Sequence, residues 1–216
     1  MTVKVNEILK INTTTDPEAK VTFKSSKKKI ATVTKDGIVK GIKKGKATIT
    51  VKANGITKKV KVKVINGTLT LDQSTINMKI NETSQITYTD DPATLPKFKT
   101  SSKTIATVDA NGLVTACQGG TATITVTVNG TSKKVKVIVE MAVITVDATS
   151  LTLKKGETYQ INATVEPDGP FTYSTSKKKY AKVSSTGLIT AVKKGNATIT
   201  VKAYGVSKKI KVKVTN

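Results

Sequence analysis

Histidine, arginine and tryptophan are absent from this sequence of 216 residues, and cysteine occurs once. Without His, the commonest general base is missing, and the nucleophile–base pairs that depend on it cannot form. The acidic residues recur beside predicted turns and make no dense oxygen-ligand loop of the kind that binds Ca²⁺. We therefore predict that the protein is not an enzyme and that it has no catalytic residues, no cofactor and no metal site.

The single cysteine, Cys117, can form no disulfide within the chain. It aligns with Ile42 and Val192 in the repeats described below, which predicts a small apolar residue on a buried face rather than a reactive thiol. Modules without disulfides must be stable by packing alone, which suits a protein that folds in a reducing cytoplasm.

Long apolar runs are also absent. No stretch of about 18 apolar residues exists, so no membrane span is predicted. The start of the chain does not resemble a signal peptide, which needs an apolar core of roughly 7 to 15 residues. If Met1 is the native start, we expect a protein that is not exported by the usual route. Aromatic residues make up only 4% of the chain, so its core must consist mainly of Val, Ile, Leu and Ala.

What the sequence does contain is one stretch that returns twice. Residues 43–64, KKGKATITVKANGITKKVKVKV, recur in similar form at residues 118–139 and 193–214. Apolar residues alternate with Thr and Lys on both sides of Asn54-Gly55, and this pattern predicts a β-hairpin with Asn-Gly at the turn. One face buries Ala47, Ile49, Val51, Ala53, Val60, Val62 and Val64, and the other carries Thr and Lys into water.

The repeat has a constant step of 75 residues, which is the spacing between equivalent residues in successive copies. Gly37, Gly112 and Gly187 follow this spacing, and residues 25–64 are identical to residues 175–214 at 24 of 40 positions. Each copy predicts about seven short strands with turn signals every 8 to 12 residues and no helical periodicity. We therefore predict an all-β protein of three tandem immunoglobulin-like β-sandwiches in an extended array. The predicted modules are module 1 (residues 1–65), module 2 (residues 66–140) and module 3 (residues 141–216).

The repeated motifs resemble a known family. Residues 26–39 read SKKKIATVTKDGIV and are followed by GKATITV at residues 45–51; residues 105–114 and 180–189 carry related versions. This pattern resembles the bacterial immunoglobulin-like domain, group 2 (BIG2), although the family often has Trp where Phe23, Phe98 and Tyr173 stand. The resemblance implies non-catalytic modules, which occur in surface adhesins, in envelope-attached proteins and on phage virions.

Modules 2 and 3 begin with a predicted strand that module 1 does not have. These strands are residues 68–71 and 143–146, and one repeat step before the first of them falls ahead of Met1. A tolerated truncation is one explanation. The other is an open sheet edge in module 1, which a strand from another chain can complete.

Charge is uneven along the chain, whose formal net charge is +23. Residues 1–64 contain 17 Lys and 4 acidic residues, residues 65–140 contain 7 and 6, and residues 141–216 contain 13 and 4. The candidate contacts for a polyanion or partner are Lys27, Lys28, Lys29, Lys43, Lys44, Lys177, Lys178 and Lys179. They are alternatively a solvated surface that keeps edge strands soluble. Lysine without Arg gives a sequence-blind attraction, so no specific nucleic acid is predicted.

These observations favour a structural and surface-binding protein. The predicted setting is a phage virion assembled in the host cytoplasm, where the chain is a capsid decoration or fibre-like accessory protein. Its predicted partners are other virion proteins, of the capsid or tail, and a host-surface polysaccharide. The alternatives are a fragment of a bacterial cell-surface adhesin, displayed outside the cell, and a non-specific polyanion-binding protein.

Overall fold

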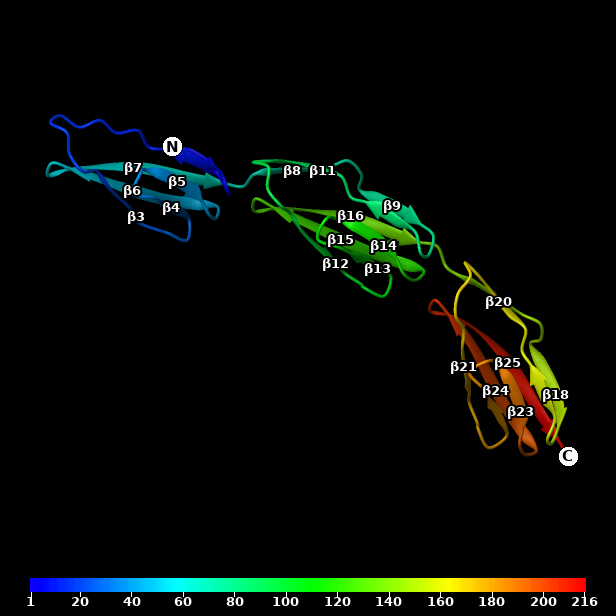
Figure 1. Ribbon diagram of the computed structural model, residues 1–216. Coiled ribbons are helices and arrows are strands. Elements are labelled where there is room, and N and C mark those ends of the chain that lie inside the picture. Colours follow the sequence, from blue (N-terminus) through cyan, green and yellow to red (C-terminus); the bar gives the residue numbers. More distant parts are fainter.

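The computed structural model describes every residue from Met1 to Asn216. It contains 25 strands and no helix, and therefore no helix that could cross a membrane. The strands form three β-sandwiches that lie end to end (Figure 1). The predicted fold class is confirmed.

Each strand belongs to one of the three modules. Module 1 comprises β1 (Thr2–Lys4), β2 (Ile8–Lys10), β3 (Thr22–Ser25), β4 (Ala31–Val33), β5 (Ile38–Gly41), β6 (Gly45–Ala53) and β7 (Ile56–Ile65). Module 2 comprises β8 (Thr68–Leu71), β9 (Thr75–Met78), β10 (Thr83–Gln85), β11 (Tyr88–Asp91), β12 (Lys97–Thr100), β13 (Ala106–Val108), β14 (Leu113–Ala116), β15 (Gly120–Val128) and β16 (Thr131–Val139). Module 3 comprises β17 (Val143–Val146), β18 (Ser150–Lys154), β19 (Thr158–Gln160), β20 (Ala163–Glu166), β21 (Thr172–Thr175), β22 (Ala181–Val183), β23 (Leu188–Ala191), β24 (Gly195–Ala203) and β25 (Val206–Thr215).

Every module has the same principal sheet of four strands. In module 2 the strand order is β12-β15-β16-β9, and β9 runs parallel to β16. The other layer contains β10-β14-β13 and the two-stranded β11-β8 sheet. Modules 1 and 3 repeat the four-stranded sheet as β3-β6-β7-β1 and β21-β24-β25-β18. The two layers bury the apolar residues of each alternating strand between them.

The hairpin predicted from Asn-Gly is present in each module. Asn54, Asn129 and Tyr204 occupy its first turn position with φ of 47°, 50° and 46°, and each is followed by a glycine with positive φ. This left-handed conformation at both turn residues explains why the sequence signal was strong. In module 3, Tyr204 occupies the first turn position, where modules 1 and 2 have Asn.

The inward face of the hairpin is buried as predicted in modules 2 and 3, but only in part in module 1. Ile49, Val62 and Val64 are buried there, whereas Val51, Ala53 and Val60 are only half-buried. No strand within residues 1–216 takes the position of β8 or β17 in module 1, and this end of the sandwich is open in the structure. The prediction that the whole face is buried is therefore wrong for module 1.

The environment of Cys117 also differs from the prediction. Its side chain is half-buried, and its thiol lies 3.6 Å from the carbonyl oxygen of Thr115. Because Ala116, at the end of β14, faces the core, the residue that follows it turns away from the core.

Specific contacts join the modules. Between modules 1 and 2, Asn6 Nδ2 donates to Asn129 Oδ1 at 2.9 Å. At the start of module 2, Asn66 Nδ2 donates to the Gly130 carbonyl at 2.7 Å, which holds the residue after β7 against the β15–β16 turn. Between modules 2 and 3, Asn81 Nδ2 donates to the Tyr204 hydroxyl at 3.3 Å. The first two modules lie nearly in line and the third is inclined to them (Figure 1).

Candidate functional site

The candidate site lies on the outer face of the four-stranded sheet. In module 1 the register places Lys46 opposite Lys63, and Thr48 opposite Lys61, on adjacent strands of the hairpin. These residues alternate with the buried Ala47 and Val62, so all of their side chains point to solvent. The strands therefore build a lysine-rich surface while their inward residues build the core.

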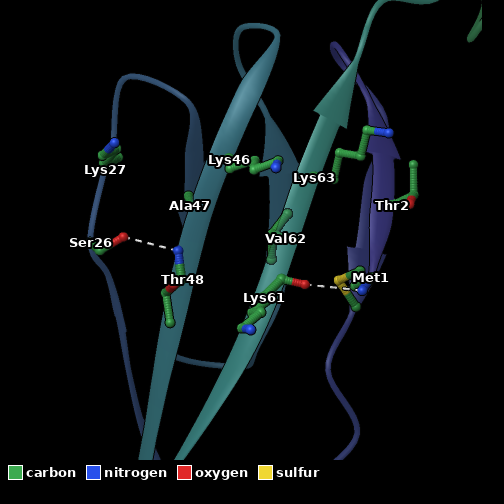
Figure 2. Close-up of a pocket in the computed structure, with 10 residues that line it drawn as sticks. All are labelled: Met1, Thr2, Ser26, Lys27, Lys46, Ala47, Thr48, Lys61, Val62 and Lys63. Atoms are coloured by element: carbon green, nitrogen blue, oxygen red, sulfur yellow. Dashed lines mark hydrogen bonds between the residues drawn. The ribbon is translucent and has the colours of Figure 1, made fainter.

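A shallow depression of about 600 Å³ occupies this face of module 1. Its lining is drawn in Figure 2 and consists of Met1, Thr2, Ser26, Lys27, Lys46, Ala47, Thr48, Lys61, Val62 and Lys63. The Thr48 N–H donates to Ser26 Oγ at 2.9 Å, which fixes the loop after β3 against β6. The amino group of Met1 donates to the Lys61 carbonyl at 3.0 Å, which holds the chain next to β7.

Module 3 has the same depression, with a volume of about 540 Å³. Its lining residues are Ser150, Leu151, Thr152, Ser176, Lys177, Asn196, Ala197, Thr198, Lys211, Val212 and Lys213. Apart from Ser150, each stands two repeat steps after a lining residue of module 1. The same bond from the Thr198 N–H to Ser176 Oγ, at 2.9 Å, fixes the loop. We call these two surfaces the lysine basins.

Module 2 has the same backbone at this place but different side chains. Its residues at the positions of Lys27, Lys46, Lys61 and Lys63 are Ser102, Thr121, Lys136 and Ile138. The Thr123 N–H still donates to Ser101 Oγ at 2.9 Å, so the loop geometry is retained. Three of the four charges present in module 1 are thus replaced by uncharged residues.

No carboxylate neutralises the lysine basins. The one salt bridge of the structure joins Lys4 to Asp91 at the junction of modules 1 and 2. Lys46 and Lys63 face each other directly across the strands, an arrangement of like charges that costs stability. Clustered charges without counter-charges create a positive potential that attracts anionic ligands, and the attraction weakens as salt increases.

The structure brings together only some of the lysines predicted from sequence. Lys27 and Lys177 line the two lysine basins. Lys28, Lys29, Lys43, Lys44, Lys178 and Lys179 lie outside their linings. In module 3, Lys179 Nζ lies 4.8 Å from the centre of the Tyr180 ring, within the range of a cation–π contact.

Sequence reasoning missed the strand lysines of the basins. Lys46, Lys61, Lys63, Lys211 and Lys213 were interpreted only as the solvated face of a hairpin. The signal that could have found them is the hairpin register, which sets Lys61 and Lys63 beside the loop that carries Lys27. The same register applied to module 2 would have shown that the charges are missing there.

The fold and this repeated surface define a class of protein: tandem immunoglobulin-like modules with one sheet face exposed. The model of the bacterial Ig-like domain (group 2) matches residues 1–64, 68–139 and 140–214. The chain therefore belongs to this family, as the resemblance of the repeated motifs predicted. Modules of the family are typically non-catalytic, and they suggest a protein displayed at a surface. No curated protein matches the chain in sequence.

Several solved structures are similar to parts or all of the chain. The S-layer protein rSbsC is 20% identical with a TM-score of 0.32; the match covers 91% of this chain, which spans 35% of the S-layer chain. Extracellular domains 3–5 of Drosophila OTK are 12% identical with a TM-score of 0.36, and the match covers 100% and 93% of the two chains. The I9–I11 tandem of titin is 12% identical with a TM-score of 0.41, covering 99% and 95%.

Proposed function

We propose that this chain is a non-enzymatic structural and surface-binding protein whose outer modules bind polyanionic surface polymers through the lysine basins. The observation that carries the proposal is the repetition of the basin in modules 1 and 3. In both, a loop lysine and two lysines of the last strand line one depression. Two separate positive surfaces on one chain allow simultaneous attachment to a long polymer, which raises the overall affinity above that of either alone.

The chemistry of the basins favours a polymer with repeated negative charges. Successive outward lysines along β7 are two positions apart, so their Cα atoms repeat about every 6.6 Å. Ammonium groups on flexible stems act as point charges and impose no planar, bidentate geometry. The proposed ligands are accordingly anionic polysaccharides and phosphate-containing wall polymers, bound by charge rather than by sequence or ring recognition.

The proposed setting is a phage particle, on which the chain is a capsid decoration or fibre-like accessory protein that contacts host-surface polysaccharide. Membership of a family that also occurs on virions supports this setting.

The second candidate is a fragment of a bacterial surface adhesin, which agrees with the surface display that the family suggests. Mass spectrometry of purified phage particles should detect the chain in many copies; its absence from particles, together with an export signal in the coding sequence upstream of Met1, would favour the adhesin.

The binding proposal is tested with heparin and purified wall teichoic acid as probes. A variant with Lys61→Gln, Lys63→Gln, Lys211→Gln and Lys213→Gln should lose roughly tenfold or more in affinity at low salt, about 50 mM. The matched control carries Lys97→Gln, Lys99→Gln, Lys133→Gln and Lys134→Gln, which remove the same charge from exposed positions of module 2. The control should lose much less.

These two variants distinguish binding at the lysine basins from a general attraction of polyanions to the net charge of the chain. Equal losses in both would show that the chain binds polyanions only through its net charge of +23. Binding by that mechanism should also disappear for every polyanion at a few hundred millimolar salt, without preference among them. Such a result would replace the proposed function with non-specific polyanion binding.

A further inference from the structure

A groove of about 350 Å³ lies at one end of module 1, between residues 12–16 and the β6–β7 hairpin. Val51 and Ala53 of β6 and Ile56 of β7 contribute apolar atoms to its lining. Ile56 is 63% exposed, and the other two are half-buried. The groove is separate from the lysine basin of module 1, with which it shares no lining residue.

Modules 2 and 3 show what fills the same place in a complete sandwich. In module 2, β8 pairs antiparallel with β11, from Thr68 opposite Asp91 to Leu71 opposite Tyr88, and it packs against β16. In module 3, β17 pairs in the same way with β20. One repeat step before β11 lie Thr13–Asp16, and no strand of this chain pairs with them.

The covering strand completes the core where it is present. The side chains of Leu69 in β8 and Ile144 in β17 are each 3% exposed. In module 2, which has such a strand, Val126 and Val135 are fully buried, whereas their counterparts in module 1, Val51 and Val60, are half-buried. Module 1 therefore leaves uncovered an apolar surface that one strand would bury.

Two hydrogen bonds beside the receiving edge of module 1 match those beside the paired strand of module 2. Asn54 Nδ2 donates to the Pro17 carbonyl at 3.0 Å, as Asn129 Nδ2 does to the Pro92 carbonyl in module 2. The Ala19 N–H donates to Thr15 Oγ1 at 3.0 Å, matching the bond from the Thr94 N–H to Asp90 Oδ2. A preformed edge lowers the ordering cost of binding a strand.

Both covering strands share a sequence pattern, in which two apolar residues at alternate positions are followed by Asp. The segments are Leu69-Thr70-Leu71-Asp72 and Ile144-Thr145-Val146-Asp147. In module 3 the Asp147 carboxylate accepts from the backbone N–H and Nδ2 of Asn162, at 3.1 and 3.0 Å. Two repeat steps before Asn162 stands Asn12, which lines the groove. The excess of lysine over acidic residues in module 1 also favours an acidic residue in the ligand.

We propose that the groove of module 1 binds one extended segment from outside residues 1–216, with the pattern apolar–x–apolar–Asp and paired antiparallel with Thr13–Asp16. This is strand addition to an exposed edge, where main-chain hydrogen bonds give affinity and alternate side chains give specificity. A second copy of this chain does not fit as the donor, because both of its segments with this pattern are already paired inside their own modules. The inference does not depend on the lysine basins.

The probe is a synthetic peptide with the sequence of residues 66–73, NGTLTLDQ, titrated into the intact chain. Nuclear magnetic resonance should show shifts at Thr13–Asp16 and Ile56, and hydrogen exchange should show new protection of the amides of Thr13–Asp16. A peptide with Leu69→Asn should bind at least tenfold more weakly, because its buried apolar contact is lost. A peptide with Asp72→Asn should bind several-fold more weakly.

A variant of the chain provides the matching test on the groove. Ile56→Lys changes an exposed residue, so the fold is retained, and it should abolish peptide binding while polyanion binding persists. Equal binding of the two peptides with Leu or Asn at position 69, or shifts confined to Tyr88–Asp91, would overturn the inference. Dimerisation of the chain that protects Thr13–Asp16 without peptide would overturn the inference in favour of a strand from a second copy of residues 1–216.

Discussion

Module 1 and module 2 have the same principal sheet, yet the ends of their sandwiches differ. In module 2, β8 covers the apolar residues of the hairpin, and Val126 and Val135 are fully buried. In module 1, Val51 and Val60 are only half-buried, and Val51 lines an open groove. The hairpin therefore specifies the principal sheet, while the completeness of the core depends on a separate short strand.

The outer faces of the same two modules differ in a second way. The principal sheets share one register, but module 1 carries Lys46 opposite Lys63 where module 2 carries Thr121 opposite Ile138. Outward positions do not contribute to the core, so they can change charge without changing the fold. Surface chemistry, rather than backbone geometry, therefore distinguishes the outer modules from the central one.

The largest expected effect concerns the covering strand. Ile144→Ala should destabilise module 3 by about 2–5 kcal/mol, because a buried side chain is replaced by a cavity at the end of the core. Val143→Ala in the same strand is the control; this side chain is 63% exposed, and the change should stay within about 0.5 kcal/mol. Hydrogen exchange at β20 measures both effects, and similar values for the two variants would contradict a core role for β17.

The next prediction transfers the lysine basin to module 2. Thr121→Lys with Ile138→Lys should strengthen binding to wall teichoic acid several-fold at low salt. The plot of log affinity against log salt should steepen by about 0.9 for each lysine that meets a phosphate. The new pair of like charges should cost about 0.2–1 kcal/mol of stability, as measured by urea unfolding. Unchanged affinity would show that the lysine basins of the outer modules do not act through these strand positions.

A smaller effect is expected at the junction of modules 1 and 2. Gly55 and Gly130 occupy the same turn position with φ of 74° and 76°, so alanine strains both by about 1–2 kcal/mol. A Cβ at Gly130 would lie 2.8 Å from Asn66 Oδ1, whereas a Cβ at Gly55 meets nothing within 4 Å. Gly130→Ala should therefore also weaken the Asn66 contact, by about 1 kcal/mol. Small-angle scattering should change for Gly130→Ala and stay constant for Gly55→Ala; two unchanged profiles would argue against a fixed junction.

The smallest effect concerns pH. Desolvation acts to raise the pKa of Asp147, but hydrogen bonds from the Tyr159 hydroxyl and from Asn162 outweigh it, so the pKa lies below the ordinary 3.8. The stability that this carboxylate contributes is present above pH 3.8 and is lost as pH falls through its lower folded pKa. Acidification should thus increase hydrogen exchange in β17 more than in β8, whose Asp72 has Ser84 and Thr87 at the partner positions. Asp147→Asn should remove this difference; a difference that persists in the variant would assign it to another group.

Much of this architecture followed from local patterns. Alternation around Asn54-Gly55 predicts the hairpin because positive φ and period-two burial are properties of short segments. The constant repeat step predicts three modules because each copy contains the same strands and turns. The candidate site cannot be predicted from local patterns in the same way, because its residues come from separate segments. Lys27 was identified from a run of lysines in a loop, but its neighbours Lys61 and Lys63 come from β7, which is distant from that loop in the sequence.

The family, the strand pattern of each module and the uneven distribution of charge can all be predicted from the sequence, because they depend on local spacing and composition. Which lysines share a surface, and which apolar residues remain uncovered, can be seen only in the folded chain. Both depend on the register between strands and on packing between layers, which bring distant residues together. The half-burial of Val51 and Val60 is the clearest case: their local pattern matches that of module 2, but the fully buried Val126 and Val135 belong to a sandwich that includes β8.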